Sequence, residues 1–216
     1  MIELYDRYSQ ESRDLHESLV ATGLSQLGVV IDADGFLPDG LVSPFTYYLG
    51  YEKGKPLYFN QVPVPAFWEI MGNNSSATIN DLLQERAVIH YADGMQARLV
   101  KQVDWKDLEG RVRQIDHYNR FGACFATTTY SADSEPIMTV YQDVNGQEVL
   151  LENYVTGDIL LTLPGQPMRY FANKVEFITF FLQDLEIDTS QLIFNTLATP
   201  FLVSFHHPDK SGSDVL

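Results

Sequence analysis

The runs Ile137-Met-Thr-Val-Tyr-Gln142 and Val149-Leu-Leu-Glu-Asn-Tyr154, joined through Asn145-Gly146, decide the fold class. Both runs are rich in β-branched and aromatic residues, which suit a pleated, half-buried surface. Asn-Gly between two such runs is a strong hairpin signal, because both residues tolerate the positive φ of a type I′ turn. The sequence therefore predicts an antiparallel hairpin at residues 137–154.

The same pattern extends outward from this hairpin over residues 44–171. Further turn signals occur at Asp93-Gly94, Glu109-Gly110, Phe121-Gly122 and Pro164-Gly165. Many short strands joined by tight turns predict an antiparallel meander, without a convincing helical segment inside it. The expected strands cover residues 46–49, 57–61, 67–71, 77–80, 86–91, 97–105, 112–119, 124–130, 137–142, 149–154, 159–163 and 168–171.

Helices and strands alternate at both ends of the chain. Residues 1–24 predict a short strand and then a helix that ends at Gly23, and residues 29–31 predict a buried strand. Asn173 and Glu176 form a capping pair for a helix over 173–186, and residues 192–194 and 201–205 predict two more strands. Val215 and Leu216 look like the start of a further element, so we expect a longer natural protein.

These patterns predict an α+β protein in which a large antiparallel β-meander is inserted into a Rossmann-like lobe. The expected division is 1–43 for the start of the lobe, 44–171 for the inserted sheet and 172–216 for the return to the lobe.

Composition excludes several classes of function. The formal net charge is -15, from 14 basic and 29 acidic residues, so the chain should repel nucleic acid and anionic lipid surfaces. Cys124 is the single cysteine and lies in an apolar segment, which predicts a buried, unreactive thiol. The chain has neither a secretory signal pattern nor a run as long as a membrane span, so we expect a cytoplasmic protein.

The sequence shows no motif for catalysis or cofactor binding. It has no G-x-G-x-x-G, Walker A, H-E-x-x-H, G-x-S-x-G or S-x-x-K pattern. His90 and His117 are interpreted as sheet-face residues with satisfied nitrogens, and His206-His207 as a solvated loop before Pro208. Asp32, Asp34 and Asp39 are interpreted as turn residues. We therefore expect no catalytic residue, metal or cofactor in this chain.

One cluster suggests a contact with a partner. Six of the fourteen basic residues lie between Arg98 and Arg120, with aromatic residues among them. The candidate interface residues are Trp105, Arg111, Arg113 and Tyr118. Arg with aromatic residues is typical of interface hot spots. The alternative is a solvated sheet face with cross-strand pairs to Asp104, Asp107 and Asp116.

Several stretches carry a resemblance to a known family. They are Asp14-Leu-His-Glu-Ser-Leu19, Gly35-Phe-Leu-Pro38 with Ser43-Pro44, Tyr58-Phe-Asn-Gln-Val-Pro-Val-Pro65 with Phe67-Trp-Glu-Ile70, Arg98-Leu-Val-Lys-Gln-Val-Asp-Trp105, Val155-Thr-Gly-Asp-Ile159 and Phe194-Asn-Thr-Leu-Ala-Thr-Pro-Phe-Leu-Val-Ser204. The chain resembles the N-terminal half of the accessory-Sec glycosylation chaperones. These are the stabilising, non-catalytic subunits of the bacterial O-GlcNAc transferase for serine-rich-repeat adhesins.

The resemblance implies a two-lobed GT-B-type fold with an extended β-sheet domain in the first lobe. It also implies pairing with a catalytic O-GlcNAc transferase subunit that binds UDP-GlcNAc, with the inserted sheets bringing the subunits together. The stabilising subunit holds the serine-rich acceptor polypeptide and increases its partner's activity. The catalytic relatives have a glycine-rich loop near their start. Here the residues from Tyr5 to Ser12 contain no glycine, so no catalytic residue is carried over.

Three functions remain open from the sequence. The leading one is a non-catalytic, acceptor-presenting partner in the cytoplasm, with at most peripheral association with the cytoplasmic face of the membrane. The second is the first lobe of an active GT-B glycosyltransferase. The third is a carbohydrate- or peptide-binding β module that uses Trp68 and Trp105 as stacking platforms.

Overall fold

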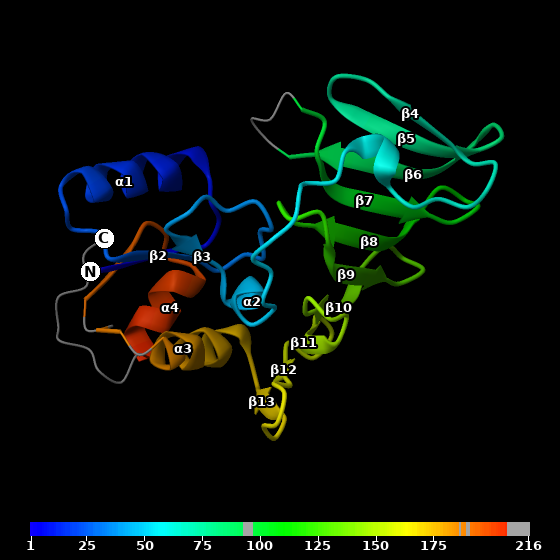
Figure 1. Ribbon diagram of the computed structural model, residues 1–216. Helices are drawn as coiled ribbons and strands as arrows, with labels where there is room; N and C mark the ends of the chain where they lie inside the picture. Colours follow the sequence, from blue (N-terminus) through cyan, green and yellow to red (C-terminus); the bar gives the residue numbers. More distant parts are fainter. Residues whose placement is uncertain (93–96, 186, 189–190, 207–216) are drawn as a thin grey trace.

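The computed structural model describes residues 1–92, 97–185, 187–188 and 191–206. They form a four-stranded parallel sheet in the order β14-β1-β2-β3 and a ten-stranded antiparallel sheet in the order β13 to β4 (Figure 1). The parallel strands are β1 Ile2–Tyr5, β2 Leu27–Val30, β3 Leu41–Val42 and β14 Leu192–Phe194. The helices are α1 Gln10–Ala21, α2 Pro44–Tyr47, α3 Lys174–Asp184 and α4 Thr199–His206, with the 3₁₀ turn η1 Phe59–Gln61.

The antiparallel sheet is a continuous meander, because each strand pairs with the next one along the chain. This confirms the predicted antiparallel meander. Its strands are β4 Glu69–Gly72, β5 Ser76–Asp81, β6 Gln84–Tyr91, β7 Val100–Lys106, β8 Val112–Tyr118, β9 Cys124–Tyr130, β10 Pro136–Gln142, β11 Glu148–Asn153, β12 Ile159–Leu161 and β13 Arg169–Phe171. The predicted turn at Asp93-Gly94 and the histidine at 207 lie outside the described residues.

The parallel sheet buries both of its faces, with α1 on one side and α3 and α4 on the other (Figure 1). Along β1, Leu4 packs toward α3, whereas Tyr5 belongs to a small cluster on the α1 side. Glu3 also lies on the α1 side and is fully buried. Its Oε2 accepts a hydrogen bond from the Tyr5 hydroxyl at 2.7 Å and lies 2.6 Å from His16 Nδ1. Two polar partners therefore offset the burial of Oε2, whereas Oε1 is buried without a hydrogen-bond partner among the described residues.

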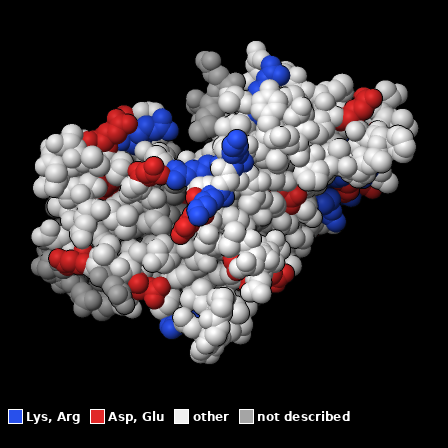
Figure 2. Space-filling view, in the orientation of Figure 1, with Lys and Arg blue, Asp and Glu red and all other residues white. Residues whose placement is uncertain are grey.

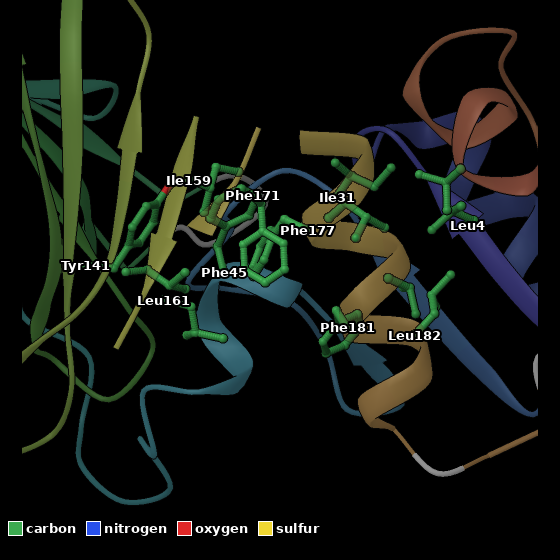
Figure 3. Close-up of a cluster of buried hydrophobic side chains, with 14 of the residues drawn as sticks. Leu4, Ile31, Phe45, Tyr141, Ile159, Leu161, Phe171, Phe177, Phe181 and Leu182 are labelled. Atoms are coloured by element: carbon green, nitrogen blue, oxygen red, sulfur yellow. The ribbon is translucent and has the colours of Figure 1, made fainter. Parts of the chain in front are cut away.

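One hydrophobic core joins the two sheets. Phe177 of α3 packs against Phe45 of α2 and Phe171 of β13, with ring centroids 5.1 and 5.5 Å apart. The same cluster includes Ile31 after β2 and Tyr141 of β10 (Figure 3). The small parallel sheet and the last strands of the meander are therefore held together by shared apolar packing.

The meander buries opposite faces in its two halves. In β5–β7, Ile79, Ile89 and Val103 pack against the segment around Val62 in a second core. In β10–β13, residues such as Tyr141 and Leu150 face the core shared with α3. Residues that pair directly point to the same side of the sheet. The successive pairs Val103↔Asp116, Asp116↔Thr127 and Thr127↔Val140 therefore show that Val140 of β10 lies on the same side as the second core, whereas Tyr141 beside it faces the core shared with α3.

Three predicted strands are wrong. Residues 46–49 fall in α2 and the turn after it, because Ser43 caps this helix and Pro44 occupies its first turn. Within residues 57–61, Phe59–Gln61 form η1 rather than a strand, and Tyr58 makes a single bridge to Leu99. Residues 201–205 lie inside α4, and His206 is also helical rather than part of a loop. Short apolar runs carry no periodicity that separates helix from strand.

Other expectations are confirmed. Asn173 caps α3 by accepting a hydrogen bond from the Glu176 amide at 3.0 Å, and the first helix ends shortly before Gly23. Asp34 and Asp39 lie in loops, where they form ion pairs with Lys101 at 3.1 Å and Arg120 at 2.6 Å. These pairs tie the loop between β2 and β3 to the meander.

None of the helices described here has the length and apolar character needed to cross a lipid bilayer.

Candidate partner interface

Arg111 and Arg113 lie together at the turn between β7 and β8. Arg111 Nε is 3.2 Å from Asp107 Oδ2, and Arg113 Nε is 3.8 Å from the same oxygen. Arg111 also pairs with Glu109, and Arg113 donates to the Ser131 carbonyl oxygen. The pair to Asp107 is the one expected under the solvated-face alternative. Whether these arginines also contact a partner remains a prediction.

Trp105 and Tyr118 lie closer to the core. Trp105 packs against the second core cluster and donates from Nε1 to Asp116 Oδ2 at 2.7 Å. Tyr118 is 7% exposed and belongs to that cluster, at the opposite end of β8 from Arg113. Trp68 packs against the same core, with the Arg86 guanidinium 5.3 Å from its ring centroid. The structure thus brings the two arginines together and sets both tryptophans against the core instead of on an open stacking surface.

An apolar row that the sequence did not indicate crosses the outer strands. Val140 pairs with Leu151, Leu151 with Leu160, and Leu160 with Tyr170, so all four side chains share one face. Tyr170 is 64% exposed, and none of the four belongs to a described core cluster. Figure 2 shows few charged side chains around β12 and β13. The sequence signal that could have indicated this row is Val149-Leu150-Leu151, because consecutive apolar residues in a strand place apolar side chains on both faces of the sheet.

A polar network fills the junction between the meander and α3. The carboxylate of Glu152 is nearly buried and forms an ion pair with Lys174 Nζ at 2.8 Å. It also accepts hydrogen bonds from the hydroxyls of Tyr141 and Tyr154 at 3.2 and 3.3 Å. Hydrogen bonds continue from Tyr154 through a pair of threonines to His117 Nε2. All of these groups except Thr128 line a cavity of about 190 Å³. Because its partners surround Glu152, the network is suited to hold the two parts of the chain together.

Within the described part of the chain, no group of three or more His, Cys, Asp and Glu side chains is placed to hold a metal ion. Cys124 is half-buried, and burial raises the pKa of its thiol to about 11. At neutral pH this cysteine is therefore protonated, which agrees with the predicted unreactive thiol.

His117 gives a pH-dependent stability that can be measured. Burial lowers the pKa of its imidazole in the folded state, so the folded protein keeps it neutral while the unfolded chain is protonated below about pH 6.5. The free energy of unfolding should therefore fall as pH decreases from about 6.5 toward the folded pKa, by at most about 1.4 kcal/mol per pH unit.

The check is thermal unfolding of wild type and His117→Gln between pH 7.5 and 5. The glutamine amide can replace the hydrogen bond to Thr128 but does not titrate, so the variant should lose less stability over this range. Other titrating groups, Asp32 among them, are common to both proteins. Equal pH slopes would show that His117 is protonated in the folded state at its ordinary pKa.

Together these features define the class of protein: a small parallel α/β lobe that carries a large antiparallel sheet with a partly exposed apolar row on its outer strands. Matches to family models cover most of the chain: the GtfB N-terminal domain at residues 2–48, the GtfB middle domain at 68–172 and the GtfB third domain at 174–216. The chain belongs to the GtfB family.

Curated relatives agree over the whole chain. A protein of Streptococcus pneumoniae serotype 4 is 92% identical over 216 residues, and one of Streptococcus gordonii is 50% identical over 218. Both are named UDP-N-acetylglucosamine--peptide N-acetylglucosaminyltransferase stabilizing protein GtfB. The match takes in 100% of this chain and 48% of each relative. The chain thus spans about half the length of the curated relatives it matches.

Solved structures show the same fold. A chain in the crystal structure of a GtfA/B complex bound to UDP and GlcNAc has a TM-score of 0.94 at 50% identity, covering 99% of this chain and 48% of that one. A chain in the structure of accessory secretory protein 1, 2 and 3 of Streptococcus pneumoniae has a TM-score of 0.71 at 10% identity, covering 96% of this chain and 50% of that one. The second likeness concerns the fold alone.

Proposed function

We propose that this chain is the N-terminal half of a non-catalytic stabilising subunit that pairs with a catalytic O-GlcNAc transferase subunit. The observation that carries the proposal is 92% identity, over all 216 residues, to a protein named as the stabilizing protein of such a transferase. In this proposal the complete subunit also presents the serine-rich acceptor polypeptide. It acts in the cytoplasm, with at most peripheral association with the membrane.

The proposal includes a finer description of the fold. Residues 1–43 and 172–216 belong to the Rossmann-like first lobe of a GT-B-type fold, and residues 44–171 form the inserted sheet. A parallel sheet with helices on both faces supports this description. The division is also supported by β14, which returns from beyond the meander to pair with β1.

The meander is the part best suited to pairing. The row Val140, Leu151, Leu160 and Tyr170 offers a sheet face outside the described core clusters, on which Tyr170 is exposed and the other three are partly buried. Each partly buried leucine that a partner covers completely would contribute up to about 1 kcal/mol. Arg111 and Arg113 offer a second contact at the β7–β8 turn. Arginine is enriched in protein interfaces, which supports this assignment.

The proposal is tested by co-purifying this chain with the candidate catalytic subunit and measuring the mass of the product in solution. A stable hetero-complex would place a pairing surface within residues 1–216. A chain that stays alone, when the complete stabilising subunit binds under the same conditions, would place pairing in the other half.

Charge reversal tests the arginine contact. Arg111→Glu with Arg113→Glu should weaken pairing about tenfold, because both substitutions put a carboxylate beside Asp107 and remove the interface cations. Leu151→Ser with Leu160→Ser is the matched variant for the apolar row. Affinity is measured by titration of the purified subunits. Unchanged affinity of the arginine variant, together with weakened binding of the leucine variant, would remove the β7–β8 turn from the interface.

A further inference from the structure

A chain of hydrogen bonds crosses one face of the meander and ends at α3. Thr128 pairs directly with Thr139, and Thr139 with Glu152, so β9, β10 and β11 carry these side chains in line. The contacts run from His117 Nε2 to Thr128 Oγ1 at 2.9 Å, from Thr128 to Thr139 Oγ1 at 2.7 Å, from Thr139 to the Tyr154 hydroxyl at 3.0 Å and from Tyr154 to Glu152 at 3.3 Å. We call this chain the relay.

Only one direction of donation satisfies every contact of the relay. An ionised carboxylate only accepts, so Tyr154 donates its hydrogen to Glu152. Each hydroxyl has a single hydrogen, so Thr139 must donate to Tyr154 and Thr128 to Thr139, which leaves His117 to donate from Nε2. In the opposite direction, the contact between Thr139 and Tyr154 would have no hydrogen. The relay therefore fixes the neutral tautomer of His117 and leaves Nδ1 as the atom that takes up a proton.

Two basic side chains share the cavity beside the relay. His117 and Lys174 both line this space of about 190 Å³, and Lys174 supplies the cation that pairs with Glu152 at 2.8 Å. A proton on His117 would place a second positive charge on the same cavity, and like charges in a poorly solvated site disfavour each other. The Lys174 side chain is 34% exposed, so Lys174 is the cation that can move into water.

The charged groups around His117 come from several elements. Burial has the largest effect and lowers the pKa of the imidazole, while Asp104 and Asp116 oppose this change and Lys101 adds to it. Asp104 also contacts His90 at 2.9 Å. The titratable and charged groups that line the cavity with His117 are Asp32, Tyr141, Glu152, Tyr154 and Lys174. Because the net effect lowers the pKa, a proton binds His117 more readily when the cavity opens to water.

We propose that the relay and the cavity form a proton-sensitive latch: when His117 gains a proton, the ion pair between Lys174 and Glu152 separates and the first turn of α3 moves away from β11. The apolar side of the junction, where Phe177 packs against Phe45, stays closed. Opening is favoured as the pH falls below the ordinary imidazole pKa of about 6.5. Its equilibrium constant should rise by at most about tenfold per pH unit, down to the pKa of the closed state.

The test is hydrogen exchange, read by mass spectrometry, on the full-length protein between pH 7.5 and 5.5. As the pH falls, amides of residues 173–180 should lose protection relative to those of residues 76–91 in β5 and β6. His117→Gln keeps a hydrogen-bonding side chain that does not titrate, so it should remove this loss. Comparing the two proteins at each pH cancels the chemical pH dependence of exchange, and Asp32, whose pKa burial raises, titrates in both.

The matched control is His90→Gln, at an exposed histidine that does not line the cavity, and it should respond as the wild type does. Equal loss of protection in the wild type and in His117→Gln would contradict the latch. A loss of the same size in residues 76–91 would also contradict it, because the chain would then be unfolding as a whole.

The tautomer gives a second measurement, which needs no histidine variant to fold. The ¹⁵N chemical shifts of the His117 ring in the full-length protein report which nitrogen carries the hydrogen, and at pH 7.5 it should be Nε2 alone. Thr139→Val removes the central hydroxyl of the relay but keeps a β-branched side chain, so the form with the hydrogen on Nδ1 should become populated. A wild-type ring with its hydrogen on Nδ1 would overturn the relay and the latch built on it.

Discussion

Replacing Phe177 by alanine is expected to lower the free energy of unfolding by about 3–5 kcal/mol. Its ring is fully buried and lies between Phe45 of α2 and Phe171 of β13. Removing it leaves a cavity at the junction of the two sheets, where neither the meander nor α3 can close the space without moving the other. The measurement is chemical denaturation followed by tryptophan fluorescence.

Phe67→Ala is the matched control, because the same atoms are removed from a ring that is 96% exposed. Its effect on stability should stay within about 0.5 kcal/mol. If both variants lost a similar amount of unfolding free energy, the ring of Phe177 would not be what stabilises the packing between the two sheets.

The Phe177 variant also tests whether the chain unfolds as one unit. One cluster contains Leu4 of β1, Phe177 of α3 and Ile159 of β12, so the parallel sheet and the outer meander bury the same core (Figure 3). We therefore expect these two parts to melt together, at a lower temperature in the variant. Two separate transitions, with only one of them shifted, would show that the parallel sheet and the meander are energetically independent.

The meander was predictable because its information is local. Turn residues such as Asn145-Gly146 and Glu109-Gly110 fix where each hairpin reverses, and the runs between them favour strands. Besides 57–61, the strand assignments that failed are 46–49 and 201–205, where Pro44 and Pro200 lie in the first turns of short helices. There a capping serine or tertiary packing outweighed an apolar run with no clear period.

The interface residues were predictable only in part. Alternation along a strand indicates which side chains share a face, but not which face is covered. Tyr118 is buried because the segment around Val62, distant in the sequence, covers that face of the sheet. The residues of β8 themselves give no indication of this contact. For the same reason the row ending at Tyr170 was missed: its uncovered state depends on where α3 packs.

Gly122→Ala is expected to destabilise the protein by about 2–5 kcal/mol, through two separable effects. The residue has a φ of 85°, which costs a side chain about 1–2 kcal/mol. A Cβ there would also overlap the carbonyl oxygen of Lys55, in the segment that runs from α2 to η1. Backbone cannot rotate aside as a flexible side chain can, so relieving the overlap must shift this segment or the β8–β9 turn, at about 1–3 kcal/mol more.

Gly110→Ala separates the two effects. Gly110 has a φ of 81°, and among the described residues no atom beyond its two chain neighbours lies within 4 Å of the position that the added methyl group would take. It should therefore show the conformational cost alone, about 1–2 kcal/mol. The difference between the two variants in denaturant unfolding then reports how tightly the segment after α2 is held against the β8–β9 turn. Equal losses in the two variants would show that this segment yields at little cost. A larger loss at Gly122 would mean that backbone contact at the β8–β9 turn fixes how the meander leaves the parallel sheet.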